Sequence, residues 1–196
     1  MNLANKLTLV RIFLIPVFLV FIAVKGIPYG TIFATLVFIA ASITDKLDGY
    51  IARSRNQITK FGKLMDPLAD KLLVTAALVS LVEYHIIPAW IAIIIIAREL
   101  AVTGLRSIAA SEGIVLAASW WGKIKTVIQI IAIVSALLEV NLSVQKELIS
   151  IVNAYPFLES FITMFANISL YIAAVVTIIS GYDYFKKNLH IIKNDI

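Results

Sequence analysis

Four aspartates lie close together in a charged stretch of an otherwise apolar chain. They are Asp45, Asp48, Asp66 and Asp70, so that consecutive members are three, eighteen and four residues apart. Side chains three or four residues apart share one face of a helix, so each pair would form an acidic stripe. Carboxylates are ligands of hard divalent cations, and four can hold two ions about 3.5 to 4 Å apart, as in phosphoryl transfer. The spacing therefore indicates a two-metal site for Mg²⁺ or Mn²⁺.

The rest of the chain has the composition of a membrane protein. Of its 196 residues, 61% are hydrophobic and 15% are charged, and the mean hydropathy is +0.95. Soluble domains are only about half apolar, and runs of about 20 apolar residues are long enough to cross ~30 Å of hydrocarbon. We expect an all-α integral membrane protein that forms one domain over residues 1–196. The absence of cysteine excludes disulfides and thiolate chemistry.

Six apolar runs are expected to span the membrane, at residues 7–24, 31–53, 64–82, 88–106, 122–140 and 157–182. On this assignment Lys25 and Lys146 lie on one side, and the other fifteen of the seventeen Lys and Arg residues lie on the opposite side. The positive-inside rule then places both termini in the cytoplasm. Basic residues beside membrane spans also contact anionic lipid, so the net charge of +5 does not indicate a nucleic-acid partner.

Depth along the spans brings the two acidic stripes to the same level. At ~1.5 Å per residue from the outer ends, Asp45 and Asp48 lie roughly 21 and 26 Å down the second span, and Asp70 and Asp66 lie roughly 20 and 26 Å down the third. Pro67 either starts the third helix, with Asp66 as its N-cap, or kinks it. The alternative to a metal site is a solvated loop in which nearby cations neutralise the aspartates; these cations are Lys46, Arg53, Lys63 and Lys71.

A second group of charges is expected at the level of the aspartates. Arg106, Lys123 and Lys125 lie roughly 27, 26 and 22 Å from the outer ends of their spans by the same rise. Such cations indicate an anionic ligand such as a phosphate, unless they only extend to the membrane surface. Arg98 and Glu99 lie deeper, and Arg98 either faces the cavity or has a structural role.

The aspartates also belong to a longer pattern, D-x-x-D-G-x-x-A-R-x8-G-x3-D-x3-D. It is met without a departure by Asp45, Asp48, Gly49, Ala52, Arg53, Gly62, Asp66 and Asp70. This pattern resembles the signature of the CDP-alcohol phosphatidyltransferase family. The stretches NKLTLVRIFLIP, AREL, TGLR and GKIKT are similar to bacterial members that use glycerol 3-phosphate as the acceptor.

The resemblance implies a six-transmembrane-helix bundle that forms a homodimer in the bacterial cytoplasmic membrane, with its active site near the cytoplasmic face. It implies transfer of a phosphatidyl group from CDP-diacylglycerol to glycerol 3-phosphate, with release of CMP. The four aspartates would hold two divalent ions, and Asp70 would be the general base. The CDP moiety would be bound by Asp48, Gly49, Ala52, Arg53 and Gly62.

Other acceptors and one other function remain open from the sequence. Sibling enzymes of the family transfer the phosphatidyl group to phosphatidylglycerol, giving cardiolipin, or to serine or inositol phosphate. The basic residues Arg106, Lys123 and Lys125 favour a phosphorylated acceptor over serine, but they do not separate glycerol 3-phosphate from inositol phosphate. From a different class, the acidic cluster could be the ion site of a divalent-cation transporter, although the outer halves of the spans carry few polar residues.

Overall fold

The chain folds into a bundle of long helices. The computed structural model describes residues 3–54, 60–111, 113, 114, 116, 119–145, 148, 149 and 155–193, and within these ranges it leaves out the side chains of residues 3–5, 45–54, 60–64, 66, 156 and 189–193. Six long helices lie in the described ranges: α1 (Leu3–Ala23), α2 (Gly30–Ser54), α3 (Lys60–Glu83), α4 (Ala89–Ser111), α5 (Trp120–Val144) and α7 (Pro156–Lys193).

Each helix coincides with one of the apolar runs, and the main differences lie at the ends. α3 begins at Lys60 and continues through Pro67, so Asp66 lies inside the helix and is not its N-cap. α7 continues well beyond the apolar run that ends at residue 182, and it is kinked at Asn188 (φ −114°, ψ 16°) before it ends at Lys193. α3 therefore begins before its apolar run, and α7 ends after its own. Both helices extend past the segment that packs against apolar surroundings.

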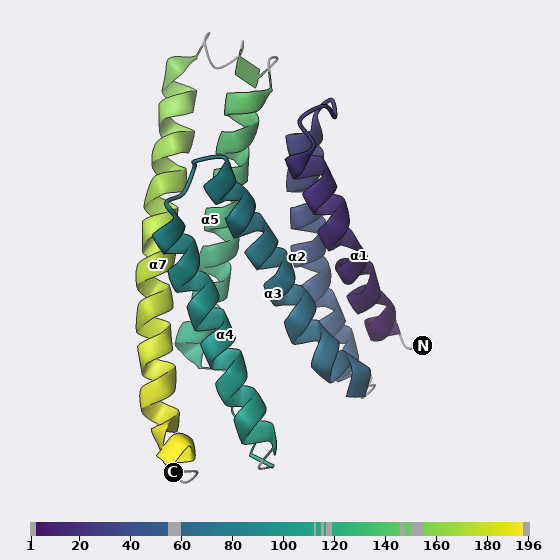
Figure 1. The fold of residues 1–196 in the computed structure, drawn as a ribbon, viewed down its shortest axis with the longest axis vertical. Coiled ribbons are helices and arrows are strands. Elements are labelled where there is room, and N and C mark those ends of the chain that lie inside the picture. The colour runs from purple at the N-terminus through teal and green to yellow at the C-terminus, as the bar shows by residue number, and fades with distance from the viewer. Residues whose placement is uncertain are drawn as a thin grey trace.

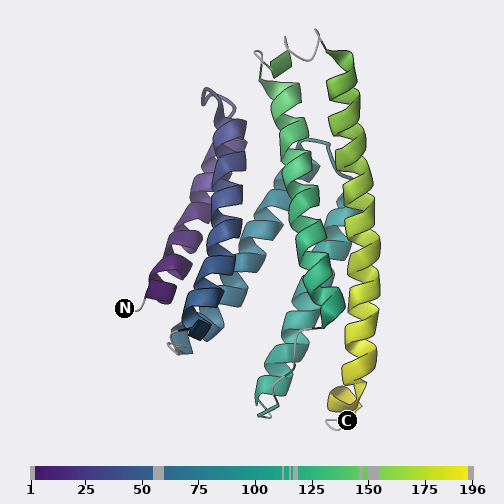
Figure 2. The same ribbon diagram turned by 180° about the vertical axis from the view of Figure 1, so that it is seen from behind.

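The helices form two groups that pack against each other (Figures 1 and 2). α1 and α2 lie side by side with α3 against both, while α7 packs along α5 and also contacts α4. The two groups meet where α3 contacts α4 and α5, and where α2 contacts α5. The C-terminal end of α2 and the N-terminal end of α3 lie beside each other, at the lower end of the bundle in both views.

One continuous hydrophobic cluster joins all six helices. Its most buried members include Phe18, Phe38, Leu78, Ile95, Leu137 and Leu170, one from each helix in chain order. A second, smaller cluster of Val102, Leu105 and Tyr184 joins α4 to α7. Because Tyr184 is only 2% exposed, its ring fixes the C-terminal half of α4 against α7.

Three of the described helices are long and apolar enough to cross a membrane, by length and composition alone. These segments are Lys6–Ala23, Trp120–Val144 and Phe157–Asn188, while the apolar part of α2, Gly30–Thr44, is shorter. Large apolar side chains on α7 point away from the bundle, including Phe157, Phe161 and Phe165. Such extensive apolar exposure is typical of a surface that meets lipid. The other three helices, α2, α3 and α4, do not meet this criterion, and a total of six spans stays a prediction.

Candidate functional site

The two helices that carry the aspartates bring their acidic segments to one end of the bundle. The backbone is helical at Asp45 and Asp48 in α2 and at Asp66 and Asp70 in α3, and these two helices contact each other. Only the Asp70 side chain is described. The predictions that fall on the side chains of the other residues lie outside the described part; these residues are Asp45, Asp48, Gly49, Ala52, Arg53, Gly62 and Asp66.

Asp70 lines a cavity of about 210 Å³ to which four helices contribute. Its charged and hydroxyl-bearing walls include Asp70, Arg98, Glu99, Arg106, Lys123 and Tyr184. The cavity therefore brings the predicted general base together with two of the three predicted phosphate-binding residues. Groups of three or more metal-binding side chains do not occur among the described residues, of which only Asp70 belongs to the predicted metal-binding quartet.

Arg106 and Lys123 are the cations that this cavity has available for an anion. Arg106 donates from Nε to the Tyr184 hydroxyl at 2.9 Å, and its Cζ atom lies 5.3 Å from the centre of the Tyr184 ring. Within the described side chains, neither Arg106 nor Lys123 forms an ion pair with a carboxylate. Two cations with no ion-pair partner among the described side chains, in one cavity with the Asp70 carboxylate, suit a ligand that carries both a phosphate and a hydroxyl group.

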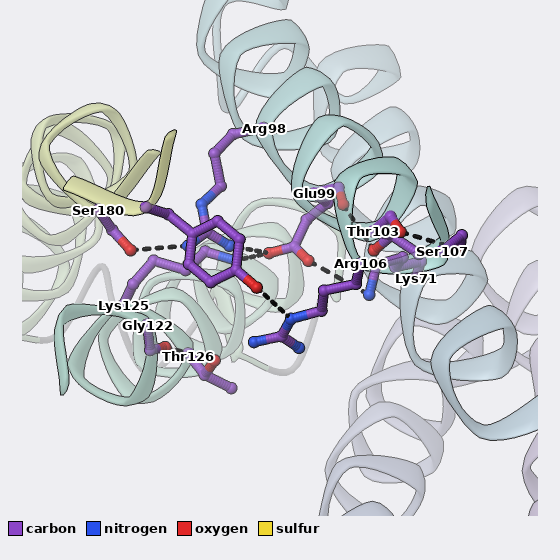
Figure 3. Close-up of polar contacts among 11 residues, drawn as sticks. Lys71, Arg98, Glu99, Thr103, Arg106, Ser107, Gly122, Lys125, Thr126 and Ser180 are labelled. Atoms are coloured by element: carbon purple, nitrogen blue, oxygen red, sulfur yellow. Dashed lines mark hydrogen bonds and ion pairs between the residues drawn. The ribbon is translucent and has the colours of Figure 1, made fainter. Parts of the chain in front are cut away.

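Lys125, the third predicted phosphate-binding residue, is placed differently (Figure 3). Its side chain is 3% exposed and its ammonium group pairs with the carboxylate of Glu99. Glu99 also lies 3.5 Å from the ammonium group of Lys71 and 3.7 Å from the guanidinium of Arg98. The charge of Lys125 is therefore already compensated within the protein. Its contact with an acceptor phosphate stays a prediction.

Arg98 lines the cavity and also ties α4 to α7. Its NH2 group donates to Ser180 Oγ at 2.7 Å. Two glycines leave room for this long side chain: a Cβ atom at Gly181 would lie 3.2 Å from Arg98 Cγ, and one at Gly122 would lie 3.9 Å from NH2. The buried Nε of Arg98 has no hydrogen-bond partner among the described groups. Arg98 thus combines the two roles that the sequence left open, facing the cavity and joining helices.

Two residues that position the site were not identified from the sequence. Ser119 is the N-cap of α5, where its Oγ accepts a hydrogen bond of 3.1 Å from the Gly122 amide. A serine just before an apolar helix is a typical N-cap, so this signal was present. Tyr184 is separated from Arg106 by 78 residues, and nothing in the local sequence of either residue indicates their contact.

Comparisons with known proteins agree with the family pattern. The family model for CDP-alcohol phosphatidyltransferases matches residues 1–179. The chain is 47% identical to a Bacillus subtilis protein over 98% of this chain and 97% of that protein, and 39% identical to a Haemophilus influenzae protein over 93% and 91%. Both relatives are named CDP-diacylglycerol–glycerol-3-phosphate 3-phosphatidyltransferase. A Mycobacterium tuberculosis protein named probable phosphatidylglycerophosphate synthase is 42% identical over 67% of this chain and 64% of its own.

Proposed function

The chain belongs to the CDP-alcohol phosphatidyltransferase family, and we propose that it transfers a phosphatidyl group from CDP-diacylglycerol to sn-glycerol 3-phosphate, giving phosphatidylglycerophosphate and CMP. The shared cavity of Asp70, Arg106 and Lys123 is the observation that carries a phosphorylated acceptor, and the names of the relatives favour glycerol 3-phosphate over inositol phosphate. A carboxylate beside two cations that have no carboxylate partner among the described side chains suits an alcohol that carries a phosphate. Serine carries no phosphate, and the charge of its one carboxylate is offset by its own ammonium group, so it would pair with these cations less well than a phosphate.

In the proposed reaction, Arg106 and Lys123 bind the phosphate of the acceptor and orient its C1 hydroxyl toward Asp70. Asp70 accepts the hydroxyl proton while the oxygen attacks the phosphorus of the phosphatidyl group. The bond from this phosphorus to the bridging oxygen breaks, and CMP leaves with the electron pair. Orientation of the two reactants in one site lowers the barrier because the step no longer depends on a chance encounter.

The aspartate quartet would hold two divalent ions, Mg²⁺ or Mn²⁺. The donor set fits such ions because all four groups are carboxylates, spaced by three or four residues on two contacting helices. When bound, the ions would neutralise the negative charge that develops on the phosphoryl oxygens. We further propose that Asp48, Gly49, Ala52, Arg53 and Gly62 bind the CDP moiety.

We also propose that all six helices cross the bacterial cytoplasmic membrane, with both termini in the cytoplasm and the site near the cytoplasmic face. The site-bearing ends of α2 and α3 and both chain ends lie toward the same end of the bundle, which supports this topology (Figures 1 and 2). The acyl chains of CDP-diacylglycerol would then remain in the lipid while its head group reaches the cavity. The active form is proposed to be a homodimer, as the family resemblance implies.

An acceptor panel tests the proposed function. Purified protein with labelled CDP-diacylglycerol and Mg²⁺ is offered glycerol 3-phosphate, inositol phosphate, serine and phosphatidylglycerol in separate reactions. We expect CMP release and a labelled phosphatidylglycerophosphate product with glycerol 3-phosphate alone. Turnover with one of the other acceptors in its place would assign the chain to a sibling activity. Divalent-cation flux into proteoliposomes without CMP release would support the transporter alternative.

A further inference from the structure

Glu99 is a largely buried carboxylate to which the proposed reaction assigns no role. Its side chain is 15% exposed and lies among cations from three helices: Lys71 of α3, Arg98 of α4 and Lys125 of α5 (Figure 3). Among these, Lys125 is the most buried, at 3% exposed. A buried ammonium group depends on a carboxylate partner, because its charge has lost most of its hydration.

A second carboxylate lies close to the same ammonium group. Asp70, Lys71, Glu99 and Lys125 all line a small cavity of about 40 Å³, beside the larger cavity of the candidate site. Asp70 and Glu99 are the two carboxylates among its described lining residues. Lys125 therefore lies where either carboxylate could attract it, and in the structure it pairs with Glu99.

We infer that Glu99 is a positioning residue, which holds the Lys125 ammonium group away from Asp70 and so leaves the Asp70 carboxylate accessible from the larger cavity. The inference rests on the proposed function, in which Asp70 receives the acceptor proton. It also changes the role predicted for Lys125, which is held by Glu99 and leaves the binding of the acceptor phosphate to Arg106 and Lys123. Without Glu99, Lys125 would turn to Asp70 and occupy the oxygens that the reaction uses.

The test compares Glu99→Gln, Lys125→Met and the double variant. Glutamine keeps the shape of Glu99 but removes its charge. We expect Glu99→Gln to lower kcat about tenfold or more, equivalent to ~1.4 kcal/mol, with less than about threefold change in KM for glycerol 3-phosphate. Adding Lys125→Met should raise kcat again at least several-fold above that of Glu99→Gln, because the competing ammonium group is gone. Glu139→Gln is the matched control and should keep the wild-type kcat. Like Glu99 on α4, Glu139 is a partly buried glutamate, but it lies on α5.

Results from either Glu99→Gln or the double variant would overturn the inference. One is a wild-type kcat in folded, monodisperse Glu99→Gln. The other is a double variant that shows no recovery, or in which KM for glycerol 3-phosphate rises well above that of Glu99→Gln, since Lys125 would then bind the phosphate directly. A purely structural ion pair would change the melting temperature of the variants but not the kcat of the folded protein.

Mn²⁺ binding supplies a readout besides activity. Isothermal titration should show weaker Mn²⁺ binding in Glu99→Gln and recovery in the double variant, because an ammonium group at Asp70 repels the cation. Equal Mn²⁺ affinity in the wild type and Glu99→Gln would contradict the inference. Failure of the proposed function is distinguishable, because it would show as absent turnover of glycerol 3-phosphate in the wild type, where Glu99 and Lys125 are intact.

Discussion

The guanidinium of Arg106 is held by Tyr184 through both a 2.9 Å hydrogen bond and contact with the aromatic ring. Arg106 lies toward the C-terminal end of α4 and is exposed, whereas Tyr184 on α7 is 2% exposed. A long, exposed arginine would otherwise sample many rotamers, and ordering it only when the ligand binds would reduce affinity. The contact therefore orders Arg106 in the absence of a ligand, as the proposed binding of an acceptor phosphate would require.

Tyr184→Phe tests this preparation. The variant keeps the ring and its packing but loses the hydroxyl that accepts from Arg106. We expect KM for glycerol 3-phosphate to rise roughly three- to tenfold, the usual effect of one hydrogen bond, while kcat changes less than about twofold. Steady-state kinetics over acceptor concentration measure both values. Tyr182→Phe is the matched control, because Tyr182 is 68% exposed and lies outside the lining of the cavity. An unchanged KM in Tyr184→Phe would show that the hydroxyl contributes nothing to acceptor binding.

The positions of the helices could be predicted because each contains a long apolar run, although only three of the described helices meet the length and composition of a membrane span. The ends of α3 and α7 could not be predicted in this way. Residues 60–66 of α3 are charged or polar at several positions, so apolar length gives no sign that the helix starts at Lys60. The same holds for the end of α7, where the sequence after residue 182 is rich in charged and polar residues. Hydropathy reports where a helix meets apolar surroundings and not where its hydrogen bonds begin.

The sequence predicted the depth at which the site residues lie along their helices, but not which of them form ion pairs with one another. Counting the rise per residue placed Asp70, Arg106 and Lys123 at a similar depth, and they do line one cavity. The same count grouped Lys125 with Lys123, although two residues correspond to ~200° around a helix, so the two side chains point to different sides. Depth alone could not show that Glu99 of α4 faces Lys125 of α5, because this depends on how the two helices are rotated in the bundle.

Asp70→Asn is expected to remove most of the turnover. Asparagine keeps the size of the side chain but cannot accept the acceptor proton, and loss of a general base typically costs about 10²- to 10⁴-fold in rate. Binding of CDP, measured by calorimetry, should remain detectable because other residues are proposed to hold the nucleotide. Asp183→Asn is the matched control, since Asp183 pairs with the exposed Lys187 at 2.8 Å and does not line the cavity. Near-normal activity in Asp70→Asn would refute its assignment as the base.

Removal of divalent ions should abolish turnover reversibly. Chelation followed by gel filtration is expected to leave a folded protein without activity, and addition of Mg²⁺ or Mn²⁺ should restore it. The reason is that the aspartate quartet brings four negative charges to one end of α2 and α3, where they would repel the substrate pyrophosphate unless cations are bound. CMP release before and after chelation measures the effect. Full activity in the chelated protein would exclude the proposed metal requirement.

Gly181→Ala is expected to disturb Arg98. The added Cβ atom would lie 3.2 Å from Arg98 Cγ, closer than ordinary contact, so the arginine must move and its 2.7 Å hydrogen bond to Ser180 weakens. We expect a loss of roughly 1 to 3 kcal/mol in stability, as for other overpacked sites. Gly104→Ala in α4 is the control, because a Cβ atom there meets nothing within 4 Å and alanine favours a helix. Thermal unfolding in detergent should separate the two variants, and equal melting temperatures would show that the bundle accommodates the methyl group.

The half of the bundle away from the candidate site supplies a prediction about stability that does not involve the site. Asn141 on α5 donates to Thr35 on α2 at 3.0 Å, and Gln145 donates to Thr31 at 2.8 Å, so two hydrogen bonds join these helices. In membrane proteins such interhelical bonds contribute on average about 0.6 kcal/mol and at most about 1.7 kcal/mol. A double-mutant cycle of Asn141→Leu and Thr35→Val, followed by unfolding in denaturing detergent, should give a coupling energy in this range.

Turnover in the three variants of this cycle should stay within about twofold of the wild type. Asn141 is 21 residues from the start of α5, or roughly 30 Å at 1.5 Å per residue, and the cavity lies near that start. A coupling energy of zero would mean that apolar packing alone sets the α2–α5 contact. A strong loss of turnover at full stability would instead mean that the α2–α5 contact in this distant half of the bundle affects the arrangement of the site residues.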